Sequence, residues 1–176
     1  MTTSGLAFDA DGVAYLSTLV GDVWKVTGLD RKLDAVTWKR FASGISLPLG
    51  LEVVDGVLYV LGEGGITRLH DYNQDGEADY YERFSKMELQ LGGPGSENQN
   101  LERDAAGNFY VCGRRGIVRI SPDGEKMEVI SVGSRNPLGL GVRPDGLTLS
   151  DSSEGSPSNG TCTIYESNHL ENEGSV

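Results

Sequence analysis

Four segments of this chain repeat one pattern, and this repeat restricts the possible folds more than any other feature. The segments read GLAFDADGVAYLS from Gly5, GLEVVDGVLYVLG from Gly50, NLERDAAGNFYVCG from Asn100 and GLGVRPDGLTLSD from Gly139. Each reads as a strand, a tight turn at an Asp-Gly or Ala-Gly step, and a second strand. The turn glycines lie 44, 51 and 39 residues apart, at Gly12, Gly56, Gly107 and Gly146. Repeats of this period are typical of β-propeller blades.

Two further strands complete the repeat. A third strand opens on a glycine and alternates apolar with polar residues in three copies, which start at Gly21, Gly65 and Gly116. A fourth strand is readable at 38–42, 80–84 and 127–130. Four antiparallel strands in about 40 to 50 residues match the size of one blade. No window shows sustained helical periodicity, so we expect little helix.

The sequence therefore predicts an all-β chain of about four four-stranded blades. The expected blades cover approximately residues 1–46, 47–92, 96–133 and 134–176. Four blades can close a ring, but both ends of the sequence look like cuts through a longer protein, so we expect part of a larger propeller of the six-bladed type. Exposed blade faces would then contact the remaining blades of a parent protein or a second copy of the chain.

The charge of the chain limits its partners. A net charge of −11 argues against nucleic acid and against an anionic membrane surface. No segment approaches the apolar length that spans a membrane, and the N-terminus lacks the pattern of a signal peptide. Cations, neutral sugars and basic partners remain, as does the alternative that the acidic residues only keep a β-rich surface soluble.

The two cysteines, Cys112 and Cys162, lie in no metal-binding spacing. Either one disulfide in an oxidising compartment or two partly buried thiols would account for them. Cys112 sits inside an apolar strand-like run, where a small apolar side chain is the simple explanation.

An acidic segment at residues 71–82 has the spacing of a calcium loop. It reads DYNQDGEADYYE and fits the pattern D-x-[DN]-x-[DN]-G-x5-E without a gap. In that pattern several oxygen ligands come from one short loop, and the glycine at position 6 permits a sharp turn. The candidate metal ligands are Asp71, Asn73, Asp75, Glu77 through its backbone carbonyl, Asp79 and Glu82.

The flanks of this loop look like strands, so the loop is expected to join two strands at the rim of the second blade. Glu82 could close the metal shell with two oxygens, or point away and leave Asp79 to complete it. The alternative to calcium is a polar hairpin whose Asp and Asn side chains cap their own turn. We expect a calcium ion bound here to be structural rather than catalytic.

Three stretches resemble a known family: LPLGLEVVDGVLYVLGEGGITRLHDYNQDGEADYYERF, DAAGNFYVCGRRGIVRISPDG and RNPLGLGVRPDG. They look like the propeller of large secreted proteins of planctomycete-type bacteria that are classed as membrane-bound dehydrogenases. That propeller is similar to the soluble quinoprotein glucose/sorbosone dehydrogenases, which use pyrroloquinoline quinone (PQQ) and calcium. The resemblance covers nearly the whole chain and implies a periplasmic or secreted location.

The resemblance also implies residue roles. The Arg-Asn of an RNP motif contacts PQQ in these enzymes, and the matching residues are Arg135 and Asn136. The alternative is a structural role, in which these two side chains before a proline satisfy carbonyl groups between blades near the central channel. Arginine suits such a planar poly-anion because it pairs with carboxylate in a fork. The family's catalytic histidine has no match at 47–51, and we expect the only histidines, His70 and His169, to be surface residues.

Whether the chain is an enzyme stays open at this point. The first hypothesis is an incomplete or non-catalytic propeller of the quinoprotein-dehydrogenase type, which binds calcium and a sugar, another small molecule or a partner at its channel face. The second is a PQQ- and calcium-dependent sugar or alcohol dehydrogenase. The third is a scaffold that only displays loops, and fold alone does not choose among them.

Overall fold

The computed structural model describes residues 2–85, 99–113, 116–131, 137–142, 148–152 and 163–165. These residues form β-strands and connecting segments and contain no helix, which confirms the expected all-β class. In particular, the described part of the chain has no helix with the length and apolarity that a bilayer crossing demands. The chain divides into two compact units, Met1–Leu89 and Gln90–Val176.

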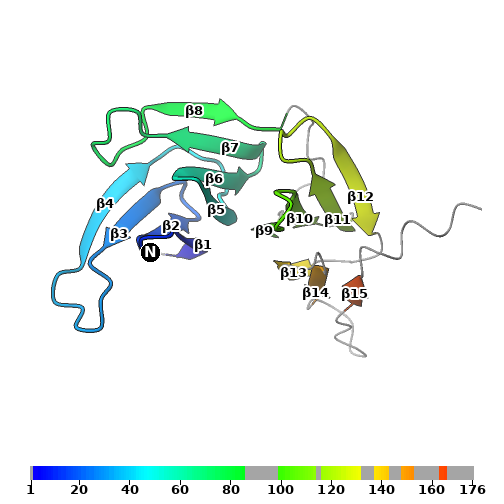
Figure 1. Ribbon diagram of the computed structural model, residues 1–176, viewed down its shortest axis with the longest axis horizontal. Helices are drawn as coiled ribbons and strands as arrows, with labels where there is room; N and C mark the ends of the chain where they lie inside the picture. Colours follow the sequence, from blue (N-terminus) through cyan, green and yellow to red (C-terminus); the bar gives the residue numbers. More distant parts are fainter. Residues whose placement is uncertain are drawn as a thin grey trace, which may run out of the picture. The chain divides into compact units, whose positions relative to one another are not determined.

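The first unit contains two four-stranded antiparallel sheets, each a meander of consecutive strands (Figure 1). The first sheet comprises β1 (Thr3–Phe8), β2 (Ala14–Thr18), β3 (Val23–Thr27) and β4 (Thr37–Ala42). The second sheet comprises β5 (Gly50–Val54), β6 (Val57–Gly62), β7 (Gly65–His70) and β8 (Tyr80–Arg83).

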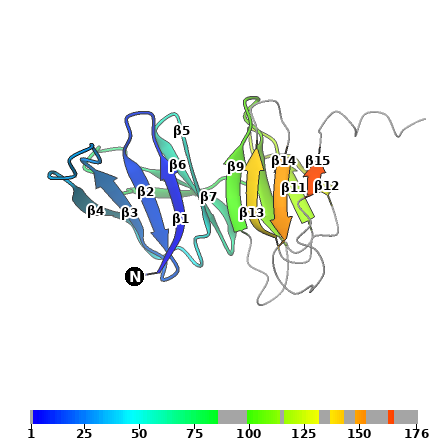
Figure 2. The ribbon, with the colours of Figure 1, turned by 90° about the horizontal axis from the view of Figure 1, so that it is seen from below.

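The second unit repeats this arrangement, and Figure 2 shows its strands side by side. Its four-stranded sheet comprises β9 (Gln99–Arg103), β10 (Phe109–Gly113), β11 (Gly116–Ile120) and β12 (Met127–Ser131). Its other sheet has three strands within the described residues: β13 (Pro137–Val142), β14 (Thr148–Ser152) and β15 (Thr163–Tyr165).

The first hairpin of three sheets turns at a glycine in the left-handed region, as the repeat predicts. Gly12, Gly56 and Gly107 have φ angles of 79°, 80° and 89°. Aspartates stabilise two of these turns: Asp9 Oδ1 accepts the N–H of Val13, and Asp104 Oδ1 accepts the N–H of Asn108. The fourth glycine of the series lies outside the described residues.

The two sheets of the first unit pack through an apolar core. Its buried members are Ala7, Tyr15, Val23, Phe41, Ala42, Leu51, Leu58, Val60 and Leu69. The rings of Tyr15 and Phe41 meet edge to face with centroids 5.4 Å apart. A side chain at Gly5 would meet Ser17 Oγ at 2.8 Å and Leu51 Cγ at 3.3 Å. Glycine at this position therefore lets β1 approach β5 closely.

The opposite face of the first sheet is also apolar. Leu6, Phe8 and Trp38 lie on it, and each is more than half exposed. When the repeats are superposed by sequence, Leu6 and Phe8 correspond to Leu51 and Val53, which pack in the core shared with the first sheet. The exposed face thus has the composition of a face that another blade covers.

Candidate functional site

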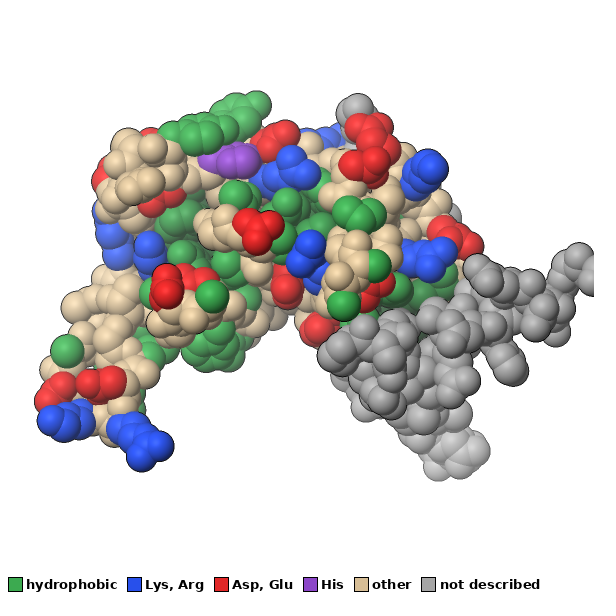
Figure 3. Space-filling view, in the orientation of Figure 1, with side chains coloured by type: hydrophobic (Ala, Val, Ile, Leu, Met, Phe, Trp, Pro, Cys, Tyr) green, Lys and Arg blue, Asp and Glu red, His purple; other side chains and the backbone are tan. Residues whose placement is uncertain are grey.

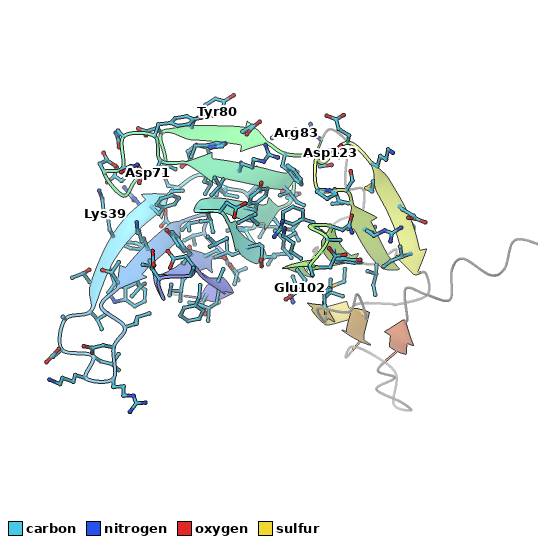
Figure 4. All side chains as sticks on the ribbon, viewed as in Figure 1. Lys39, Asp71, Tyr80, Arg83, Glu102 and Asp123 are labelled. Carbon is cyan, nitrogen blue, oxygen red and sulfur yellow. The ribbon has the colours of Figure 1, made fainter. Side chains whose placement is uncertain are left out.

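The acidic loop connects β7 to β8 in the second sheet. Its ends are closed by a hydrogen bond from the N–H of Asp79 to the carbonyl oxygen of His70, at 2.7 Å. Figure 4 shows Asp71 in this loop, Lys39 of β4 close to it, and Tyr80 at the start of β8. The flanking strands are those expected from the sequence.

Asp71, the first residue of the calcium pattern, turns its carboxylate into the loop. Its Oδ1 accepts the N–H of Asp75 at 3.1 Å, and its Oδ2 accepts the N–H of Gly76 at 2.9 Å. Gly76 has a φ of 86°, so the sharp turn at position 6 uses the left-handed conformation that glycine tolerates. One carboxylate therefore holds the tip of the loop.

Asn73 lies between two further carboxylates. Its Nδ2 donates to Asp79 Oδ1 at 3.1 Å and to Asp75 Oδ2 at 3.3 Å. The other oxygen of Asp79 accepts the N–H groups of Tyr72 at 2.8 Å and Asn73 at 3.1 Å. The amide NH2 thus supplies hydrogen-bond donors at the point where two negative groups approach each other.

Five of the six predicted ligands therefore share one hydrogen-bonded loop: Asp71, Asn73, Asp75, Asp79 and Glu77, whose backbone N–H donates to Asp75 Oδ1 at 2.9 Å. These bonds are also the ones that the self-capping alternative predicts. Calcium binding and self-capping are compatible, because a carboxylate has about four lone-pair sites and can accept N–H groups while binding a cation. Within the described ranges, no three His, Cys, Asp or Glu side chains are placed to hold a metal ion. Calcium binding would require the Asn73 amide to turn its oxygen toward the carboxylates.

Lys39 of the first sheet reaches the same loop. Its Nζ lies 3.9 Å from Asp75 Oδ1 and 3.8 Å from Glu77 Oε1, and it donates to the backbone carbonyl of Asp75. The ammonium offsets part of the loop's negative charge. Because these side chains are well exposed, each ion pair contributes at most about 1 kcal/mol.

Glu82, at the last position of the calcium pattern, lies in β8 and bonds to side chains of β7. Its Oε2 accepts from His70 Nε2 at 2.9 Å and from Arg68 Nη1 at 3.4 Å. The hydrogen bond from His70, together with the charge of Arg68, lowers the pKa of the Glu82 carboxyl. His70 is therefore a partly buried partner of Glu82, which differs from the surface residue that the sequence suggested.

Other candidate residues are distant from this loop in the sequence. Arg135, Asn136, His169 and Cys162 are outside the described residues, so the predicted PQQ contacts and the pairing of the cysteines stay predictions. Cys112 is buried in the core of the second unit, as its apolar surroundings in the sequence suggest.

Sequence reasoning missed an aromatic cluster beside the loop. The rings of His70, Tyr72 and Tyr80 lie near one another, with His70 and Tyr72 stacked at a centroid distance of 5.2 Å. The signal was present in the sequence, because His70 and Tyr80 bracket the loop and pair across β7 and β8.

Comparisons with known proteins establish the fold. No family model and no curated protein matches the sequence. Among solved structures, a candidate oxidoreductase (glucose dehydrogenase) from Thermus thermophilus is 21% identical with a TM-score of 0.59, and the match covers 85% of this chain and 56% of that one. A candidate 6-phosphogluconolactonase from Bacteroides uniformis is 13% identical with a TM-score of 0.54, over 92% of this chain and 70% of that one. The extracellular domain of a candidate one-component system from B. thetaiotaomicron is 16% identical with a TM-score of 0.59, over 93% and 24%.

These likenesses concern the fold, and the chain spans only 56% of the Thermus protein and 24% of the B. thetaiotaomicron one. The expected similarity to glucose dehydrogenases is supported at the level of the fold, while the likeness to the planctomycete-type proteins stays a prediction. Four antiparallel sheets of consecutive strands, the turn glycines and these structural neighbours lead to one conclusion: the chain is part of a β-propeller.

Proposed function

We propose that the chain is a propeller segment of the quinoprotein sugar dehydrogenase type whose second sheet is stabilised by calcium, and that it binds a sugar or another small ligand at its channel face without complete catalytic machinery. The observation that carries the calcium proposal is the arrangement of Asp71, Asn73, Asp75 and Asp79 on one short loop. Their carboxylate and amide oxygens are the ligands that calcium prefers. The ion would hold the loop together and strengthen the β7–β8 connection.

The fit to calcium rests on the chemistry of the side chains in the loop. The loop offers three aspartate carboxylates, one amide and the backbone carbonyl of Glu77, and Gly76 supplies the turn that brings them together. When bound, calcium would supply positive charge and up to eight coordination positions to these oxygens. We place Glu82 outside the shell, because its carboxylate bonds to His70 and Arg68.

Thermal unfolding with added calcium tests this proposal. At a hundredfold excess of calcium over its dissociation constant, linkage gives about 2.7 kcal/mol of stabilisation. For a unit the size of Met1–Leu89, this raises the melting temperature by about 10 °C or more. Asp75→Ala should abolish the shift. Asp123→Ala is the control and should leave the calcium-dependent shift intact. Asp123 accepts a backbone N–H in another turn, and within the described residues it has no second carboxylate as a partner. If millimolar calcium does not change the melting temperature of the wild-type protein, the calcium proposal is wrong.

A second candidate function is a PQQ- and calcium-dependent sugar or alcohol dehydrogenase. It is favoured by the fold likeness to the Thermus candidate glucose dehydrogenase and by the Arg135-Asn136-Pro137 segment. The absence of a histidine from residues 47–51 argues against this enzyme function, because abstraction of a hydroxyl proton needs a base within hydrogen-bond reach. Dye reduction with PQQ, calcium and a panel of sugars separates the two. Turnover that Arg135→Ala abolishes would support the enzyme, and no turnover with any sugar would reject it for this chain.

The exposed face of the first sheet supports a partner proposal. Leu6, Phe8 and Trp38 form an apolar surface of the kind that blades bury against each other. We propose that another blade, from a parent protein or a second copy of the chain, covers it. The extracellular domain among the structural neighbours supports a periplasmic or secreted location.

A further inference from the structure

Three aromatic rings form a platform at the loop end of β7 and β8. His70 and Tyr72 are stacked with centroids 5.2 Å apart and planes 10° apart. Tyr72 and Tyr80 lie 6.4 Å apart with planes 25° apart, and His70 and Tyr80 lie 6.0 Å apart with planes 34° apart. We call these three residues the aromatic platform. Their planes lie within 34° of one another and two of the three pairs are stacked, so the free ring surface belongs to the exposed Tyr72 and Tyr80.

Two carboxylates bond to residues of the platform. Glu82 fixes His70 through the 2.9 Å bond to its Nε2. Asp79 fixes the backbone of Tyr72 by accepting its N–H at 2.8 Å, and its own N–H donates to the carbonyl of His70. The His70 ring and the backbone that carries Tyr72 are therefore positioned before any ligand arrives, which reduces the entropy lost on binding.

Tyr72 is the outer ring of this platform. Its exposed fraction is 68% and that of Tyr80 is 52%, whereas the His70 side chain is 16% exposed. Figure 3 shows hydrophobic side chains directly above the purple histidine at the upper edge of the first unit. Exposed large aromatic side chains gathered at one place are typical of binding surfaces, because tyrosine offers a large rigid contact at low entropic cost.

The geometry and charge select the class of ligand. An aromatic cage for a methylated ammonium group encloses the cation with rings at several angles, whereas these rings are nearly parallel and open to solvent. The carboxylate of Asp79 adjoins the platform and repels anionic ligands such as phosphates, whereas the charge of Glu82 is offset by Arg68. A neutral ring with C–H groups on one face and hydroxyls at its rim matches both features, because C–H groups pack on the negative face of an aromatic ring while hydroxyls donate to carboxylates.

We propose that the aromatic platform is a carbohydrate-binding site, with a neutral pyranose ring stacked on Tyr72 and its hydroxyls directed toward the flanking carboxylates. This site differs from the channel-face site proposed above, and it requires neither calcium nor PQQ. It gives the β7–β8 loop a recognition role in addition to a structural one.

Calorimetric titration of the whole chain with cellohexaose and maltohexaose tests the site. We expect weak binding of at least one of them, with a dissociation constant on the order of 1 mM. Tyr72→Ala should weaken it at least about tenfold, while Tyr72→Phe, which keeps the ring, should retain it. Trp38→Ala is the matched control, because it removes an exposed aromatic ring from the first sheet and should change binding less than about twofold.

The outcomes separate this site from its alternatives. Saturation-transfer NMR should show the strongest contact at ring C–H protons of the sugar in the wild-type protein and lose it in Tyr72→Ala. Sugar binding that survives Tyr72→Ala would place the ligand at the channel face and overturn the platform. No binding of either oligosaccharide, or preferential binding of a proline-rich peptide, would overturn the carbohydrate class. Circular dichroism of Tyr72→Ala should match the wild type, since the side chain is mostly exposed.

Discussion

Tyr110 links the stability of the second unit to alkaline pH. Its side chain is 2% exposed, and its hydroxyl donates to Asp104 Oδ2 at 2.9 Å. Burial, together with the hydrogen bond to Asp104, raises the pKa of Tyr110 from 10.0 to about 12. A raised pKa in the folded state means that the stabilisation is fully present below pH 10.0 and is lost as the pH rises toward 12. At pH 11 the unfolded tyrosine is ionised and the folded one is not, so the loss is about 1.4 kcal/mol relative to pH 8.

Tyr110→Phe removes this titration. Urea unfolding at pH 8 and pH 11 should show a loss of stability in the variant that is about 1.4 kcal/mol smaller than in the wild type. Val129→Ala is the control, because it changes a half-exposed side chain of the same unit that carries no titrating group and should leave the wild-type loss unchanged. If Tyr110→Phe loses as much stability as the wild type over this interval, Tyr110 ionises normally and the reasoning from its burial and its bond to Asp104 is refuted.

Three further predictions follow from contacts in the first unit. Gly28→Ala should reduce the free energy of unfolding in urea by more than about 2 kcal/mol, because Gly28 has a φ of 75° and its new Cβ would lie 2.1 Å from the Ala35 carbonyl oxygen. The control is Gly44→Ala, which has a φ of 80° but no atom within 4 Å of its new Cβ, and which should cost only about 1 kcal/mol in the same assay. Glu82→Gln should lose less stability in acid than the wild type, because the lowered pKa of Glu82 stabilises the folded wild type at pH values above 4.5 and this contribution disappears as the pH falls. Melting temperatures measured between pH 7 and pH 3 test this, and an equal dependence on pH in the two proteins would contradict it. If a second copy of the chain covers this face, Phe8→Ser should reduce self-association in analytical ultracentrifugation without lowering the melting temperature, and an unchanged mass distribution would contradict docking of a second copy there.

The sequence predicted the repeat because its signals are local. An Asp-Gly or Ala-Gly step favours a left-handed turn between two strand-like runs, so Gly12, Gly56 and Gly107 marked the hairpins correctly. Alternation of apolar and polar residues placed the third and fourth strands for the same reason. The loop at Asp71 was recognisable because its ligand types and spacing are contained in one short segment.

The arrangement of side chains around that loop depends on strand pairing, which the motif does not contain. The pairing of Arg68 with Glu82 across β7 and β8 places the glutamate beside His70, away from the loop oxygens. The same register brings His70 opposite Tyr80 and creates the aromatic platform. A sequence pattern gives spacing along the chain, whereas these contacts depend on which residues face each other between strands.

Calcium binding measured by isothermal titration calorimetry on three proteins tests the central claim most directly. We expect the wild type to bind a single ion, Asp79→Asn to bind at least about tenfold more weakly, and Glu82→Gln to stay within about twofold of the wild type. These ratios follow from the bonds of Asp79 within the loop and of Glu82 to His70. The absence of a calcium-dependent heat in the wild type, or an affinity that Asp79→Asn leaves unchanged, would contradict the account.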